Sequence, residues 1–213
     1  MRYAAPGLGI VGNDVVDLAD PAIAGHHRRE RFVSRVCAPG EHLRATTAAG
    51  LWTLFAAKEA AYKALVKLGH APGFAHREIL VAPDLDAVTW HGCRLRLRVV
   101  RDDERVHAVA WSAAGDAPPL AACARADGPL ERAARALVCS LVADATGFPA
   151  AELAVVRDPA AGAWDGYGPP RMERLDRRRL DVAVDVSLSH DGRFVAAAAC
   201  VGTLLGNGVL RPE

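Results

Sequence analysis

The sequence lacks the patterns that mark disulfide-rich, zinc-binding and membrane-spanning proteins. Its five cysteines are scattered, odd in number and never spaced as Cys-x-x-Cys, which favours a reducing compartment and gives no zinc site. No apolar run approaches the ~20 residues that a membrane-spanning helix needs. The first residues show no basic segment followed by an apolar core, so we expect no signal peptide and a cytoplasmic location.

A strong excess of charge of one sign is also lacking. The 26 Lys and Arg residues nearly balance the 25 Asp and Glu residues, which gives a formal net charge of +1. No overall field therefore attracts nucleic acid or an anionic membrane, and we expect neither as a partner. With 213 residues, of which 51% are hydrophobic, the chain is long enough to bury a core without disulfides.

What is present begins with one strong helical segment, residues 51–69, on which the other predictions depend. It is rich in Ala, Leu and Lys, and its only glycine, Gly69, comes last, where a C-terminal cap belongs. On a helical wheel two adjacent apolar stripes form one wide face that must pack on a core. The stripes consist of Trp52, Phe55, Tyr62 and Val66, and of Leu51, Leu54, Leu65 and Leu68.

Glu59 lies inside the first of these stripes, which gives it two interpretations. The more common one is a salt bridge with Lys63, four residues later on the same helix face. The other is a functional carboxylate, because an ionised group among aromatic side chains must be paired or bound to a metal.

A second carboxylate, Asp14, interrupts an apolar segment at residues 7–18 that we predict to be a buried strand. Such a residue is usually a hydrogen-bonded turn aspartate, but carboxylates also suit Mg²⁺, which takes one or two of them as ligands. Asp17 lies three residues further on and should face the opposite side of a regular strand.

Two hairpins are predicted, one in each half of the chain. Residues 94–99 alternate and are followed by a returning strand over 105–112, and Asp191-Gly192 separates two apolar runs. The pattern Asp-x-Arg-apolar-x-Ala-x-Ala occurs at 103–110 and again at 191–198, which suggests an internal repeat.

These elements predict an α+β fold of two similar lobes, a pseudo-dimer. Each lobe has one helix, at 51–69 or at 130–146, packed on a small antiparallel sheet. Residues 113–129, rich in Ala, Gly, Pro and Asp, are interpreted as the seam. The lobes are predicted at 1–125 and 126–213.

A basic stretch follows the first strand, with a helix start at Asp20-Pro21. Its arginines form either a solvated face or a docking surface for phosphates or an acidic partner. They are Arg28, Arg29, Arg31 and Arg35.

Taken together, the motifs resemble those of the 4′-phosphopantetheinyl transferases. The signature of that family is Gly-x-Asp on a strand, followed by a helix with an aromatic residue ahead of Lys-Glu-Ala/Ser-x-x-Lys. This chain has Gly12-Asn-Asp14, and Phe55 ahead of Lys58-Glu-Ala-Ala-Tyr-Lys63. The segments Gly168-Pro-Pro170 and Ser187-Leu-Ser-His190 are similar to the family's Gly-x-Pro and Ser-His segments.

The resemblance implies transfer of phosphopantetheine from coenzyme A to a serine of an acyl or peptidyl carrier protein, with release of adenosine 3′,5′-bisphosphate. It implies Mg²⁺ bound by Asp14 and Glu59, and catalysis by these two residues together with Lys63. The residues implied to bind the coenzyme are Lys58, Lys63, Ser189 and His190. The basic stretch would face an acidic carrier protein. The alternative is a non-catalytic module that binds coenzyme A or a carrier protein.

The sequence departs from the larger two-lobed members of that family in two places. Val16 stands where those members carry a second acid, while the neighbouring Asp17 matches the small single-lobe synthases and leaves its part in the metal site open. The Ser-His segment also follows Gly-x-Asp instead of preceding it. The chain is therefore either two lobes in an unusual order or one lobe with an elaborated insertion that oligomerises.

Overall fold

The predicted α+β class is confirmed by a computed structural model. It describes residues 8–70, 76–112, 118–160, 166–176, 180 and 182–202, and the backbone alone of 203–205 and 209–210. The α-helices are α1 (Glu30–Val36), α2 (Ala48–Lys67) and α3 (Leu130–Thr146). Short 3₁₀ helices include η3 (Pro39–Ala45) and η4 (His76–Glu78). The strands are β1 (Val11–Asp17), β2 (Leu80–Val81), β3 (Ala87–Trp90), β4 (Cys93–Arg101), β5 (Arg105–Trp111), β6 (Leu120–Arg125), β7 (Leu153–Val156), β8 (Arg171–Arg174), β9 (Val182–Asp191), β10 (Phe194–Leu205) and β11 (Val209–Leu210).

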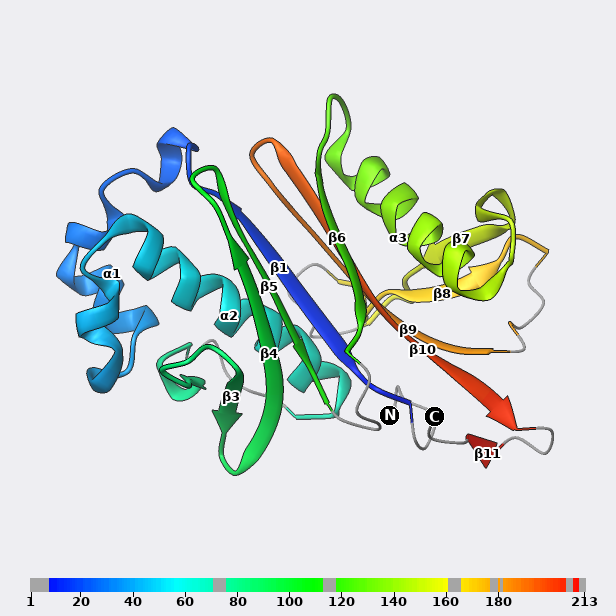
Figure 1. Cartoon of the computed structure of the whole chain (residues 1–213), viewed down its shortest axis with the longest axis horizontal. Helices are drawn as coiled ribbons and strands as arrows, with labels where there is room; N and C mark the ends of the chain where they lie inside the picture. The colour runs from blue at the N-terminus through cyan, green and yellow to red at the C-terminus, as the bar shows by residue number, and fades with distance from the viewer. Residues whose placement is uncertain are drawn as a thin grey trace.

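The strands form two main antiparallel sheets, each covered by one long helix (Figure 1). The first sheet has the order β1-β5-β4-β3-β2, and α2 packs on β1 and β5. In the second sheet β10 pairs with β6, β9 and β11, and α3 packs on β9 and β10. This arrangement is compatible with two similar lobes. The strand β6, which ends at residue 125, pairs with β10 and so lies in the second sheet.

The helix α2 has the glycine cap that its sequence predicts, but it begins at Ala48 instead of Leu51. The side chain of Thr47 accepts a hydrogen bond from the Gly50 amide at 3.0 Å, which caps the first turn. At the other end Gly69 takes a φ of 84°, and the amide of His70 donates to the carbonyl of Leu65. This left-handed glycine closes the helix as a C-terminal cap.

Both predicted hairpins are also present. The strands β4 and β5 pair from Arg96–Trp111 to Arg101–Val106, and β9 and β10 pair up to Asp191 and Phe194. The seam predicted over 113–129 includes residues 113–117, which lie outside the described residues, and also β6.

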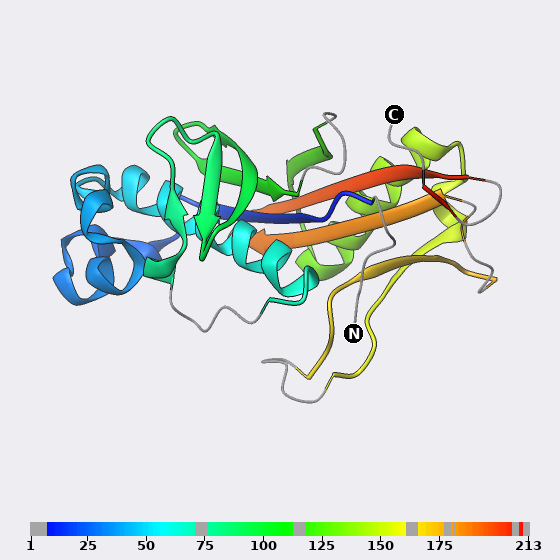
Figure 2. The same ribbon diagram turned by 90° about the horizontal axis from the view of Figure 1, so that it is seen from below.

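The two sheets meet through β1, which lies beside β9 and β10 (Figure 2). On the face of β1 away from α2, two small apolar clusters join the sheets. Val11, Val109, Trp111 and Ala198 form one cluster, and Val15, Phe194 and Ala196 form the other. Within the described ranges, no helix is both long and apolar enough to cross a bilayer.

The buried residue His107 on β5 predicts a pH dependence of stability. Its side chain lies on the face of the first sheet away from α2. Burial, reinforced by the charges of Arg98, Arg105 and Lys63, lowers the pKa of His107 to about 4. In the unfolded chain His107 takes up a proton near pH 6.5, whereas in the folded chain it stays neutral down to about pH 4. Its contribution to the free energy of unfolding is therefore present above pH 6.5 and is lost as the pH falls towards 4.

We expect the free energy of unfolding of the natural chain to fall by about 3 kcal/mol more than that of His107→Gln between pH 7 and pH 4. Urea unfolding of both proteins at several pH values measures the difference. If the unfolding free energies of both proteins changed with pH in parallel, the lowered pKa of His107 would be contradicted.

Candidate active site

The first strand and α2 approach each other unusually closely at Gly12, the glycine of the Gly-x-Asp motif. A Cβ atom at this position would lie 2.0 Å from the carbonyl oxygen of Ala60 and 2.8 Å from the amide nitrogen of Ala64. Both are backbone atoms of a buried helix and cannot move aside independently. The glycine is therefore required for close packing, and it places Asp14 next to the helix turn that carries Glu59 and Lys63.

We expect Gly12→Ala to destabilise the chain by about 1–3 kcal/mol or more, because the added methyl group must push β1 away from α2. Chemical denaturation measures the loss. Gly40→Ala is the matched control, since a Cβ atom there meets nothing within 4 Å. Equal stabilities of the two variants would contradict the close approach.

Three of the predicted site residues converge on one carboxylate oxygen. The Oδ1 atom of Asp14 accepts hydrogen bonds from Lys63 Nζ and from Ser189 Oγ, both at 2.8 Å. Lys63 also donates to the carbonyl of Asn13 at 2.9 Å. The strand β1, helix α2 and strand β9 thus meet at Asp14, although Ser189 lies 175 residues further along the chain.

Glu59 is paired with His76 instead of Lys63. Its Oε1 atom lies 2.5 Å from His76 Nε2, and its side chain is 20% exposed. Burial works against ionisation of Glu59, but the His76 hydrogen bond and charge outweigh it and lower its pKa. The common interpretation, a salt bridge between Glu59 and Lys63, is not the pairing that the structure adopts.

The two carboxylates influence each other. Burial raises the pKa of Asp14, and the nearby charge of Glu59 raises it further, while Lys63 and Ser189 oppose the shift. Within the described part of the chain, no hydrogen bond reaches Asp14 Oδ2 or Glu59 Oε2. Two neighbouring carboxylates, each with an oxygen to spare, fit a divalent cation that takes its remaining ligands from phosphate and water. Within those described ranges, no group of three or more His, Cys, Asp or Glu residues is arranged to hold a metal.

A ladder of side chains joins β9 to the edge of β1. The amides of residues 11, 13, 15 and 17 point away from β5 and donate in turn to side-chain oxygens of β9, each pair 174 residues apart. The constant offset means that the two strands run in the same direction. The acceptors are Asp185, Ser187, Ser189 and Asp191, at 2.7, 2.9, 3.3 and 2.7 Å.

Lys67 closes the same junction one helical turn beyond Lys63. Its buried amine donates to the carbonyls of Val11 and Val186 at 2.7 and 2.6 Å and pairs with Asp185 at 3.0 Å. Burial raises the pKa of Asp185, against the charge of Lys67 and the Val11 hydrogen bond. The ladder and this lysine set the position of Ser189 relative to Asp14.

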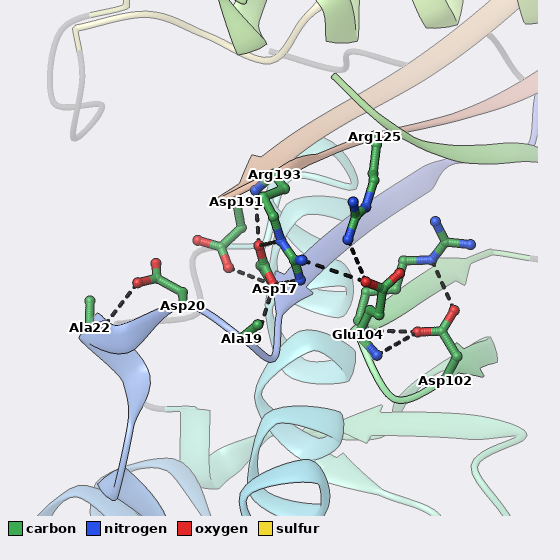
Figure 3. A network of polar contacts seen from close by, with 10 residues as sticks. Asp17, Ala19, Asp20, Ala22, Asp102, Glu104, Arg125, Asp191 and Arg193 are labelled. Atoms are coloured by element: carbon green, nitrogen blue, oxygen red, sulfur yellow. Dashed lines mark hydrogen bonds and ion pairs between the residues drawn. The ribbon is translucent and has the colours of Figure 1, made fainter. Parts of the chain in front are cut away.

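Asp17, whose part in the site the sequence leaves open, is occupied elsewhere (Figure 3). Arg193, in the turn between β9 and β10, donates to both carboxylate oxygens at 2.7 Å, and its amide adds a third bond at 3.0 Å. Ala19 donates a further bond to Oδ1. These contacts, above all the Arg193 side chain, lower the pKa of Asp17 to about 2. Arg193 also pairs with Glu104, which contacts Arg125, so Asp17 belongs to a group of ion pairs that joins the two sheets.

Lys58 lies apart from the Asp14 cluster. Its side chain is fully buried, and its amine contacts Glu41 Oε2 at 2.5 Å and the carbonyl of His76 at 3.1 Å. Its role as a coenzyme ligand stays a prediction from the resemblance. His190 is exposed near the end of β9. Ser189 and His190 therefore face different surroundings, as expected for neighbours on a strand.

Sequence reasoning missed His76, Lys67 and Asp185. Asp and Ser alternate at positions 185, 187, 189 and 191, which places four polar side chains on one face of a strand. This pattern could have indicated the ladder. The lysines carry a second signal. Only three of the 26 cationic residues are lysines, and all three lie in α2, at positions 58, 63 and 67. No pattern marks His76, because its contact with Glu59 depends on how the chain returns after α2.

Comparison with known proteins gives one match. A family model described as "4′-phosphopantetheinyl transferase superfamily" matches residues 10–123, more than half of the chain. This range holds Asp14, Glu59 and Lys63 but ends before Ser189 and His190. Searches of curated proteins and of solved structures found no match.

Proposed function

Since this chain belongs to the 4′-phosphopantetheinyl transferase superfamily, we propose that it transfers phosphopantetheine from coenzyme A to a serine of an acyl or peptidyl carrier protein. Adenosine 3′,5′-bisphosphate is the second product, as in a holo-acyl carrier protein synthase. The observation that carries the proposal is the convergence of Asp14, Lys63 and Ser189, with Glu59 on the adjacent helix turn.

In the proposed reaction the serine oxygen forms a bond to the β-phosphorus of coenzyme A. The bond from that phosphorus to the bridging pyrophosphate oxygen breaks, and the leaving group keeps its electron pair. Glu59 accepts the serine proton, directly or through a water molecule, because its lowered pKa keeps it ionised. The transfer thus needs no oxidant and no covalent intermediate on the enzyme.

Asp14 and Glu59 are the residues that would hold Mg²⁺. When bound, the ion would neutralise charge on the phosphate oxygens and on the leaving group. Lys63 supplies a fixed cation beside Asp14, where it can bind a pyrophosphate oxygen. Ser189, placed by the ladder, and the exposed His190 at the end of the same strand would bind the coenzyme.

The surface around α1 is the proposed docking face for the carrier protein. Arg28, Arg29, Arg31 and Arg35 are all exposed there, so their charges are available to an acidic partner. Leu43 on η3 is 88% exposed and offers an apolar contact on the neighbouring surface.

Intact-mass spectrometry of apo carrier proteins tests the proposal. Incubation with this chain, coenzyme A and Mg²⁺ should add one phosphopantetheine to the carrier, and a chelator should abolish the gain. Coenzyme binding without any mass gain, across carriers of fatty acid, polyketide and peptide synthesis, would favour the alternative of a non-catalytic binding module. Absence of both would contradict the proposal.

A further inference from the structure

His76 is held at three separate points, two on its ring and one on its backbone. Its ring stacks on Phe55, with centroids 5.4 Å apart and planes inclined by 15°. Its Nε2 atom lies 2.5 Å from Glu59 Oε1, and its backbone carbonyl accepts a hydrogen bond from Lys58 Nζ at 3.1 Å. The side chain is only 11% exposed, so both the ring and the backbone of this residue are constrained.

The ring can only donate to Glu59. An ionised carboxylate accepts hydrogen bonds and has none to give, so the proton of the bond lies on His76 Nε2. One oxygen of Glu59 is thereby fixed, while Oε2 forms no hydrogen bond with any residue that the structure describes. The contact orients the carboxylate and leaves one oxygen for a ligand or a proton.

The buried lysine of the Lys-Glu motif reaches the same carboxylate indirectly. Lys58 holds the backbone of His76, and Lys58 is itself held by Glu41. Glu41 in turn accepts hydrogen bonds from the amides of Ala38 and Val81, at 2.9 and 2.8 Å. A continuous chain of contacts therefore runs from η3 through Lys58 and His76 to Glu59.

We propose that His76 is a positioning residue for Glu59, and that the Glu41–Lys58 pair supports it by fixing the His76 backbone. This inference rests on the proposed transferase function, in which Glu59 accepts the serine proton. Groups that orient a reacting or metal-binding side chain matter because they restrict it to the productive geometry. Lys58 then helps to orient the carboxylate of its neighbour Glu59 without contacting it, because Lys58 acts through the backbone of His76.

Two substitutions separate the hydrogen bond from the packing of the ring. His76→Phe keeps a ring to stack on Phe55 but cannot donate to Glu59. His76→Gln loses the ring but places an amide donor where Nε2 lies. We expect His76→Phe to lower kcat by roughly 10- to 100-fold with the KM for coenzyme A changed less than about twofold, and His76→Gln to restore most of kcat.

Retention of the natural kcat by His76→Phe would overturn the proposal. Equal losses in the two variants would also overturn it, because the ring would then matter only for packing.

A second measurement tests the contact itself, even if His76→Phe fails to fold or the natural chain transfers nothing. Long-range ¹H–¹⁵N spectra report the ring nitrogens of each histidine, and the signal missing in His76→Gln identifies His76. We expect that signal to move in Glu59→Gln while those of the other histidines stay in place. No movement would overturn the inference. If the His76 signal moved but the natural chain modified no carrier protein, the contact with Glu59 would be supported and only the proposed function would be contradicted.

Discussion

Glu59→Gln is expected to lower the rate of carrier modification by about 10²- to 10⁴-fold, the usual contribution of a general base. The amide has nearly the same shape as the carboxylate but cannot accept the serine proton. It is also a poor ligand for Mg²⁺. Initial rates from intact-mass spectrometry, at saturating coenzyme A, measure the effect.

The matched control is Asp86→Asn, which removes an exposed carboxylate that pairs with Arg94 at 3.7 Å, on the loop before β3. We expect this control to keep its full rate. If Glu59→Gln retained more than about half of the natural rate, Glu59 could not be the base. A loss of rate in both variants would indicate a general effect of charge on the carrier interaction.

Lys58→Met is expected to destabilise the fold by about 3–5 kcal/mol, the usual cost of breaking a buried ion pair by removing one partner. The lysine is fully buried, and its partner Glu41 is only 5% exposed. Without the amine, the Glu41 carboxylate keeps two backbone donors and the more distant Arg44, at 3.6 Å. Equilibrium unfolding in urea measures the loss.

A double-mutant cycle makes this prediction specific to the pair. Because Glu41→Gln removes the charge that Lys58 balances, the double variant should be clearly less destabilised than the sum of the single variants. Arg94→Met, which removes an exposed cation, serves as the control and should change the stability by less than about 0.5 kcal/mol. Additive losses in the cycle would mean that Lys58 stabilises the fold by packing alone.

Local patterns in the sequence predicted much of the fold correctly. The α2 helix, its glycine cap, both hairpins and the buried β1 strand follow from periodicity and turn residues, which act over a few neighbouring positions. The gathering of Asp14, Lys63 and Ser189 agrees with the grouping that the family resemblance implied. The catalytic roles of Asp14 and Lys63 and the coenzyme-binding role of Ser189 stay proposals.

The partners of the charged residues were less predictable. Spacing alone paired Glu59 with Lys63, whereas the fold pairs Glu59 with His76 and Lys63 with Asp14. Spacing on a helix limits which neighbours a side chain can reach, but the approaching strands and loops offer competing partners. The same holds for Asp17, whose role the sequence left open and which pairs with Arg193 in the turn between β9 and β10.

By itself, the sequence determined the two long helices, both hairpins and the motifs of the family, because these depend on residues close together along the chain. It did not predict the strand β6, which lies within the expected seam. Only the tertiary structure decided which side chains meet across the junction of β1, α2 and β9. Those contacts join residues up to 176 positions apart, and their geometry is set by how closely β1 packs at Gly12 and by the register of the Asp–Ser ladder.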